Sequence, residues 1–120
     1  MTACIFCEIA AGKAPADTVS SSGSHMAFHP LNPVTPGHLL VIPRRHVTDA
    51  LSNPEVTGWV MHIAALTAKR MSRFHPEYES VNLITSVGVP ATQSVFHLHI
   101  HIVPRREGDG LALPWTGQER

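Results

Sequence analysis

The sequence lacks three features that would have placed it in a broad class of proteins. Its first ten residues have neither the basic flank nor the sustained apolar run of a signal peptide, and no stretch approaches the ~18 apolar residues of a membrane helix. Neither charge is in surplus, because nine Lys and Arg balance nine Asp and Glu. We therefore expect no membrane partner and no nucleic acid partner, and any anionic ligand must be recognised by local geometry.

Cysteine is also scarce. The two cysteines, together with the missing export signal, favour a reducing, cytoplasmic setting. Ten prolines and eight glycines are spread along the chain without a low-complexity tract. A length of 120 residues with 43% hydrophobic content fits one globular domain, so we treat residues 1–120 as a single domain.

Histidine, by contrast, is abundant, with nine residues. Three of them alternate with apolar residues from Phe96 to Ile102, which is the period of a β-strand with one buried face. On such a strand the Cα atoms of neighbouring histidines lie about 7 Å apart and those of the outer two about 13 Å apart. The core face then holds Phe96, Leu98, Ile100 and Ile102, and the other face holds His97, His99 and His101.

Three imidazoles on one strand face indicate a chemical role. Each would lose hydration or meet charge repulsion unless an anion or a metal ion compensates. The isolated histidines are expected to be structural or solvated instead, and these are His25, His29, His62 and His75.

Two kinds of chemistry fit this spacing. His97 and His99 are close enough to bind one zinc ion of a hydrolytic site, with a third ligand from elsewhere, whereas the ~13 Å span argues against all three on one ion. Alternatively, a neutral imidazole attacks phosphorus directly while neighbouring groups hold the phosphate oxygens. His99, flanked on both sides, is then the natural nucleophile.

The N-terminal Cys-x-x-Cys motif, Cys4 to Cys7, has three interpretations. It can supply half of a zinc site that takes two more ligands from the histidines, which we favour. It can be a pair of inert buried thiols, or a redox pair. A redox motif is expected to open a helix after a strand, and no segment upstream of Cys4 provides that strand.

The remaining pattern predicts one long helix, a short N-terminal helix and several strands. Ser52 and Glu55 have the spacing of a capping box, apolar residues then recur at helical intervals, and Pro76 ends the run. The short helix is expected to end at Gly12. Strands are predicted at residues 26–28, 39–42 and 80–87, the last antiparallel to the histidine strand, with a turn at 19–24 and a loop at 89–94.

The C-terminal tail, residues 107–120, is predicted to be a docking segment. A hinge at residues 107–110 precedes an apolar stretch that ends at Trp115. Such a segment near a chain end usually packs onto another surface, so a homodimer is expected.

These residues resemble one known family. His-Leu-His-Ile-His-Ile-Val, residues 97–103, resembles the signature of the histidine triad proteins. The Cys-x-x-Cys opening, Pro36-Gly37-His38 with the apolar run to Pro43, His46, and Gln93-Ser94 support it. The similarity runs from Cys4 to about Trp115 and is closest to the zinc-binding bacterial branch.

The resemblance implies an α+β fold and a nucleotide enzyme. The fold would be an antiparallel sheet of about five strands with one long helix and a short N-terminal helix, in a homodimer. The activity would be hydrolysis or transfer at the α-phosphate of a nucleoside phosphoramidate or nucleotide anhydride, through a covalent nucleotidyl-histidine, with a purine nucleoside monophosphate as product. The alternative is a nucleotide-binding or scaffold dimer with little turnover.

The resemblance also implies a role for each site residue. His99 would be the nucleophile, with His101, Ser94 and Gln93 on the phosphate, and Leu31 and Asn32 would contact the base and ribose. A structural zinc ion would be the only cofactor, with no organic one, and its ligands would be Cys4, Cys7, His46 and His97.

Three positions differ from the family pattern. Thr92 stands where a glycine is usual, Ser86 where an asparagine or glutamine is common, and Pro30 where an acidic residue is common. All three are expected around the pocket, so they bear on the choice of substrate.

Overall fold

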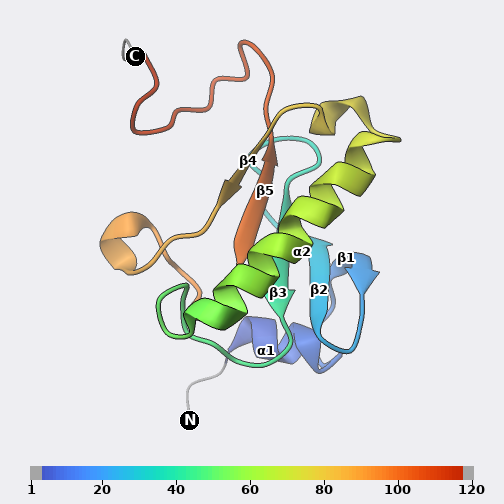
Figure 1. The fold of residues 1–120 in the computed structure, drawn as a ribbon, viewed down its shortest axis with the longest axis vertical. Coiled ribbons are helices and arrows are strands. Elements are labelled where there is room, and N and C mark those ends of the chain that lie inside the picture. The colour runs from blue at the N-terminus through green and yellow to red at the C-terminus, as the bar shows by residue number, and fades with distance from the viewer. Residues whose placement is uncertain (1–3, 118–120) are drawn as a thin grey trace.

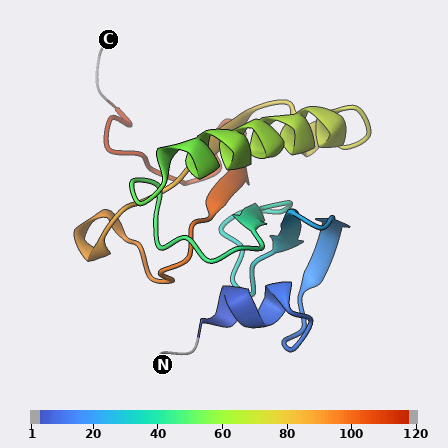
Figure 2. The ribbon, with the colours of Figure 1, turned by 60° about the horizontal axis from the view of Figure 1, so that its bottom comes forward.

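A computed structural model describes residues 4–117 as a five-stranded antiparallel sheet with a helix on each face (Figures 1 and 2). The strands lie in the order β1-β2-β3-β5-β4. Together with the long and the short helix, this architecture confirms the expected α+β fold. In chain order the elements are α1 (Ile5–Ala10), β1 (Asp17–Ser21), β2 (His25–His29), β3 (Leu39–Pro43), α2 (Pro54–Ser72), the 3-10 turn η1 (Pro76–Tyr78), β4 (Val81–Ile84), the 3-10 turn η2 (Val89–Ala91) and β5 (Ile100–Pro104).

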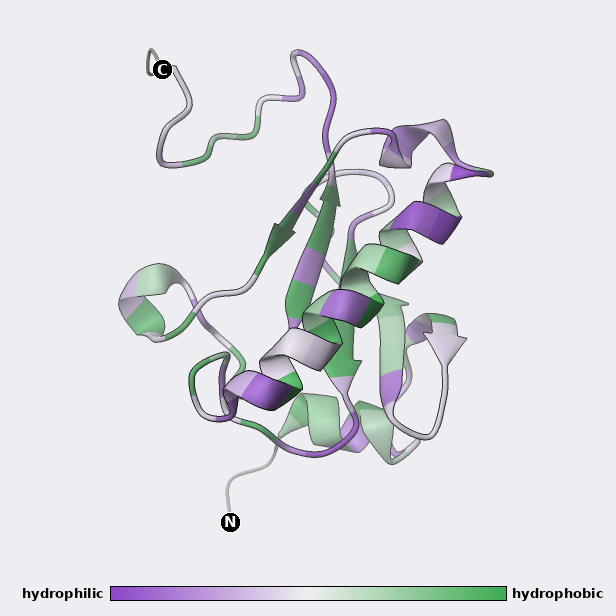
Figure 3. Ribbon diagram, viewed as in Figure 1, coloured by the Kyte–Doolittle hydropathy of each residue, from purple (hydrophilic) through white to green (hydrophobic). Residues whose placement is uncertain are grey.

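Alternation along the strands divides the core into two layers. Leu39, Val41, Ile100 and Ile102 are buried on the face that α2 covers. Leu40 and Ile42 point to the opposite face and pack with Phe6, Ile9, Met26 and Phe28 beneath α1. In Figure 3 the inner strands are accordingly mostly hydrophobic, while α2 alternates between polar and apolar residues. His99 and His101 lie on the α1 face, because Ile100 and Ile102 occupy the other.

Helix α2 covers the sheet with a narrow buried stripe. Its four fully packed residues are Val60, Ala64, Thr67 and Ala68. The N-cap is Asn53, whose side chain accepts a hydrogen bond from the Val56 N–H at 3.3 Å, so the predicted cap at Ser52 is wrong by one residue. The Ser52 hydroxyl donates to Asp49 instead. The helix ends before Pro76, as predicted, because proline there begins η1.

The histidine strand is shorter than its alternation predicted. Strand β5 begins at Ile100, so residues 96–99 are not in the ladder and Phe96 is 45% exposed rather than in the core. The cause is a contact with a distant part of the chain: the Leu98 N–H donates to the carbonyl of Val47, which holds this segment against the loop after β3. Leu98 itself remains buried, as expected.

Two other boundaries also differ from the prediction. Strand β1 pairs with β2 through Ser21, so the turn predicted at residues 19–24 is confined to its last residues. The predicted strand at 80–87 contracts to β4, which pairs with β5 antiparallel, as expected. Neither helix of residues 4–117 combines the length and the hydrophobicity that crossing a bilayer requires.

Candidate functional site

Cys4, Cys7, His46 and His97 converge at one end of α1. Their four ligand atoms lie within 4.8 Å of one another. The Nδ1 atom of His97 is 3.5 Å from both sulfurs, and the Nδ1 atom of His46 is 3.3 Å from the sulfur of Cys7. A tetrahedral zinc ion with ordinary bond lengths separates its ligand atoms by about 3.3 to 3.8 Å. The four side chains therefore fit zinc with little rearrangement, in a closed set that leaves no position for water.

Backbone groups orient two of these ligands, Cys4 and His97. Cys4 is the N-cap of α1, and its sulfur accepts from the Cys7 N–H at 3.3 Å, so the first turn of the helix brings the two thiols together. The Nε2–H of His97 donates to the carbonyl of Pro43 at 2.8 Å. The unprotonated Nδ1 atom therefore directs its lone pair toward the two sulfurs.

Burial favours the uncharged forms of Cys7 and His97. Burial raises the pKa of the Cys7 thiol to about 11, with further contributions from Cys4 and Glu8. Burial lowers the pKa of His97, so its ring is neutral at pH 7. A bound divalent cation would stabilise the thiolate and use the neutral imidazole, which is the combination that zinc binding requires.

His99 lies one step further along the same face. Its Nδ1–H donates to the carbonyl of His97 at 2.8 Å, so Nε2 carries a free lone pair. Burial lowers the pKa of His99 below its usual value, although the hydrogen bond to the carbonyl opposes the shift. The ring is therefore neutral at pH 7, as a nucleophile must be.

His101 has the complementary tautomer, and His38 imposes it. The Val34 N–H donates to Nδ1 of His38 at 3.1 Å, so the proton of His38 is on Nε2. That Nε2–H donates to Nδ1 of His101 at 2.9 Å, and His101 is left with its proton on Nε2. Burial, with nearby His99 and His38, lowers the pKa of His101 to about 4. His101 is therefore a neutral hydrogen-bond donor beside the neutral imidazole of His99, with the two ring centroids 5.1 Å apart.

Sequence reasoning did not assign a role to His38. Its ring is 3% exposed and lies behind His101 because β3 pairs with β5, with Leu40 opposite His101. The backbone before it requires glycine: Gly37 has φ +86°, and a Cβ there would stand 2.9 Å from the Tyr78 hydroxyl. Pro36-Gly37-His38 was the available signal, since it precedes a buried strand.

The sequence pattern also did not predict that Phe6 and Phe28 form an apolar wall beside His99. The ring of Phe6 meets His99 edge-on at 5.1 Å between centroids and packs on Phe28 at 5.6 Å. Leu31 and Asn32, expected at the base and ribose, lie on the exposed loop that follows β2, where Leu31 is 98% exposed. Phe6 and Phe28 are themselves buried, at 6% and 3% exposure, whereas the loop is open to solvent.

Gln93 and Ser94 precede the histidine segment in a tight loop. The Gln93 amide is buried and fully used within the chain: its oxygen accepts from the Gly88 N–H at 2.8 Å, and its nitrogen donates to the carbonyls of Thr48 and Val95. Ser94 is exposed. Gln93 therefore holds the loop in shape, while Ser94 is accessible to a ligand from solvent.

Thr92 is in the left-handed region, with φ 77°, and no other residue between 4 and 117 except glycine has a positive φ. A β-branched side chain is strained there by about 1–2 kcal/mol. The positive φ explains why glycine is usual at this position in the family. We expect Thr92→Gly to raise the free energy of unfolding by about 1 kcal/mol, measured by urea denaturation.

A matched control is available one residue earlier. Ala91 lies in η2 without a positive φ, so Ala91→Gly should lower the free energy of unfolding by about 0.5–1 kcal/mol. If both glycine variants were destabilised, the strain at Thr92 would be compensated elsewhere and our account of it would fail.

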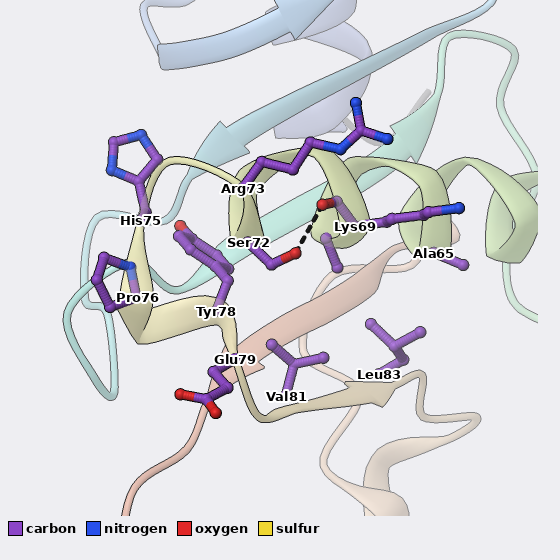
Figure 4. A pocket seen from close by; sticks show the side chains of 11 residues that line it. Ala65, Lys69, Ser72, Arg73, His75, Pro76, Tyr78, Glu79, Val81 and Leu83 are labelled. Carbon is purple, nitrogen blue, oxygen red and sulfur yellow. Dashed lines mark hydrogen bonds between the residues drawn. The ribbon is translucent and has the colours of Figure 1, made fainter.

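A large cavity lies away from His99 and His101, with His75 in its lining. It has a volume of about 610 Å³ and lies between the end of α2, η1 and β4, as Figure 4 shows. A smaller one, of about 340 Å³, is lined in part by His38 and His101. Because chemistry depends on the donor groups rather than on volume, we place the candidate site at His99 and His101.

Known proteins resemble this chain over most of its length. It matches the HIT domain family over residues 11–108. It is 34% identical to adenosine 5'-monophosphoramidase of Saccharomyces cerevisiae, over 98% of this chain and 72% of that protein. It is 36% identical to protein hit of Bacillus subtilis, over 93% of this chain and 78% of that protein. The crystal structure of a zinc-bound histidine triad family protein from Mycobacterium smegmatis aligns with a TM-score of 0.81 at 35% identity, covering 92% of this chain and 81% of that one.

Proposed function

The chain belongs to the HIT domain family, and we propose that it cleaves nucleotides at the α-phosphate through a covalent nucleotidyl-histidine. The observation that carries this proposal is the pairing of two neutral imidazoles with opposite tautomers. His99 presents a lone pair on Nε2, and His101 presents an N–H on Nε2. One is suited to attack phosphorus and the other to hold a phosphate oxygen.

The proposed reaction has two steps. Nε2 of His99 attacks the α-phosphorus, a phosphorus–nitrogen bond forms, and the bond to the leaving group breaks. With a phosphoramidate, the departing nitrogen takes a proton from solvent and leaves as the amine. Water then attacks the same phosphorus, returns the electron pair to His99 and releases the nucleoside monophosphate. His101, Ser94 and the backbone near Gln93 would stabilise the charge on the phosphate oxygens in both steps.

We propose a purine as the base, on the wall formed by Phe6 and Phe28, with Leu31 and Asn32 closing the other side. Aromatic edges and apolar side chains pack well on a flat heterocycle.

We also propose zinc as the ion at Cys4, Cys7, His46 and His97, in a structural role. A catalytic zinc shared by His97 and His99 is disfavoured, because Nδ1 of His99 is bonded to a carbonyl and Nδ1 of His97 faces the two thiols. The two free cysteines support a reducing compartment, the cytoplasm.

Adenosine 5'-phosphoramidate is the substrate that tests this function, since one relative is named for its action on such a compound. We expect the protein to release AMP from this compound. Chromatography measures the rate of AMP release at each pH of a series. Because burial and neighbouring imidazoles lower the pKa of His101 to about 4 and burial lowers that of His99, the acid limb of kcat/KM should fall below pH 6.5, the usual histidine pKa. Tight AMP binding without turnover would instead favour the scaffold alternative.

We also propose a homodimer that joins two copies along β4. This strand is an edge of the sheet, so its outer backbone groups are unpaired within the sheet. Val81 and Leu83 lie on its α2 side and, with Ala65, line the cavity of about 610 Å³ (Figure 4). A second copy would bury this apolar surface and continue the sheet. Trp115, at 54% exposure, has no deep packing site in its own chain.

Light scattering at micromolar concentration should therefore give twice the mass of the chain. Ala65→Arg places a charge on this surface without changing a core residue, and we expect it to give the monomer mass. The control is Leu51→Arg, in an exposed loop away from β4, which should stay dimeric. A monomeric wild type would contradict the proposal.

A further inference from the structure

The turn that leads into β3 determines how His38 reaches His101. The peptide group between Gly37 and His38 is planar, so its carbonyl and its N–H turn together as one unit. The N–H belongs to His38 and donates to the carbonyl of Thr35 at 3.2 Å. The carbonyl belongs to Gly37 and accepts from the hydroxyl of Tyr78. Both polar ends of this peptide are therefore held, and the Cα atom of His38 is attached directly to it.

Tyr78 comes from η1, far from this turn in the sequence. Its side chain is buried and lines the cavity of about 610 Å³ at the end of α2 (Figure 4). The ring lies against Gly37, where a Cβ would stand 2.9 Å from the hydroxyl oxygen and 3.1 Å from Cζ. Burial, with Glu77 nearby, raises the pKa of Tyr78, so the hydroxyl keeps the proton that it donates. Within residues 4–117 the Gly37 carbonyl accepts a hydrogen bond from no other group.

The imidazole of His38 carries this positioning to His101. Its Nδ1 atom accepts from the Val34 N–H at 3.1 Å, and its Nε2–H donates to Nδ1 of His101 at 2.9 Å. The carbonyl of His38 accepts from Nδ1–H of His29 at 2.9 Å, which holds the other side of the residue. A rotation of the peptide before His38 would move the ring out of line with His101, and a hydrogen bond weakens steeply as it bends. The ring of His101 would then be free to carry its proton on either nitrogen.

We propose that Tyr78 is a positioning residue for the proposed reaction. By holding the peptide between Gly37 and His38, it keeps His38 in line with His101, and His38 in turn keeps the proton of His101 on Nε2. The inference rests on the proposed function, because that N–H is the group assigned there to a phosphate oxygen. Tyr78 acts on the turn and not on the substrate, so its effect on turnover passes through His38.

Tyr78→Phe tests this role, because it removes the hydroxyl and keeps the ring. Long-range ¹H–¹⁵N NMR spectra at pH 7 report which ring nitrogen of a histidine carries the proton, and the signals of His101 are those that His101→Asn lacks. We expect His101 to be protonated on Nε2 alone in the wild type and to populate both tautomers in Tyr78→Phe. The kcat for adenosine phosphoramidate should fall about tenfold, with KM changed less than about twofold, because the aligned donor stabilises the transition state more than the bound substrate.

Thr67→Val is the matched control. Thr67 is buried in α2, and its hydroxyl donates to the carbonyl of Ile63 at 2.8 Å, so this variant also loses one buried O–H that is bonded to a backbone carbonyl. It lies outside the contacts that join Tyr78 to His101. We expect it to keep both the tautomer of His101 and the wild-type kcat, even if its stability falls.

Two further variants separate the hydroxyl from the packing of the ring. Replacement of Tyr78 by 4-aminophenylalanine returns an N–H donor to the Gly37 carbonyl and should restore the tautomer and kcat. Replacement by 4-fluorophenylalanine fills the space of the hydroxyl without a donor, so it should behave as Tyr78→Phe and takes its place if that variant does not fold. In a His38→Asn background, Tyr78→Phe should lower kcat no further.

A folded Tyr78→Phe with the wild-type tautomer of His101 and the wild-type kcat would overturn this inference and leave the proposed function standing. Equal losses in Thr67→Val would overturn it as well, because the effect would then be one of general stability. A wild type that releases no AMP would refute the proposed function, and the role of Tyr78 in the reaction with it.

Discussion

Replacement of His99 by asparagine is expected to reduce kcat for adenosine phosphoramidate by about four orders of magnitude or more. Asparagine can still donate to the carbonyl of His97, as the Nδ1–H of His99 does at 2.8 Å, but its amide has no nucleophilic lone pair directed at phosphorus. The pocket is otherwise preserved, so the Kd for AMP, measured by calorimetry, should change less than about tenfold.

His101→Asn is the matched comparison on the same strand face. It removes a hydrogen-bond donor rather than the nucleophile, so we expect a smaller loss, about 10²- to 10³-fold in kcat. Rapid quench of the wild type with substrate labelled at the α-phosphate should trap an acid-labile, base-stable phosphorus–nitrogen adduct. Near-normal turnover of His99→Asn, or label on Ser94, would show that the proposed mechanism is wrong.

The second large effect is expected at the metal cluster. Native protein purified under reducing conditions should contain about one zinc ion per chain by elemental analysis. Cys7→Ser should lose the metal and lower the free energy of unfolding by about 3 kcal/mol or more, because a zinc ion on these four residues would join α1, the loop after β3 and the segment before β5. For a chain of this size the corresponding fall in Tm is on the order of 10 °C, measurable by calorimetry.

Two further measurements make this result specific. His62→Ala removes an exposed histidine outside the cluster and should keep both the metal and the Tm. Zinc binding should weaken at acid pH, because thiolates and neutral imidazoles are lost as they take up protons. Metal-free native protein with the same Tm as zinc-loaded protein would contradict a structural zinc. Abolished turnover after chelation, in protein that remains folded, would reinstate a catalytic one.

Local sequence patterns predicted those parts of the molecule that depend on neighbouring residues. Alternation placed His99 and His101 on one face, opposite Ile100 and Ile102, because successive side chains of a strand point in opposite directions. The same rule failed at Phe96, where a hydrogen bond from Leu98 to Val47, distant in the chain, removes the segment from the ladder. A period predicts faces only while the residues remain in the strand.

The four cysteine and histidine ligands illustrate an intermediate case. The spacing of Cys4 and Cys7 indicated half of a metal site, since one helical turn brings both thiols together. The family resemblance supplied His46 and His97, which the spacing alone did not. Their convergence depends on how α1 packs under the sheet, and that is a property of the core rather than of the motif.

Tertiary structure alone decided three features of the site. These are the tautomers of His38 and His101, the packing of Phe6 against His99, and the backbone strain at Thr92. His38 contacts His101 only because β3 pairs with β5 in one register, so the proton on Nε2 of His101 depends on a residue 63 positions away. The sequence contained His99, the proposed nucleophile, together with its neighbours and the strand that presents them, because those follow from short-range periodicity. Strand register, side-chain packing and the hydrogen bond from Tyr78 to Gly37 join residues distant in the chain, and no local period encodes which distant residues will meet.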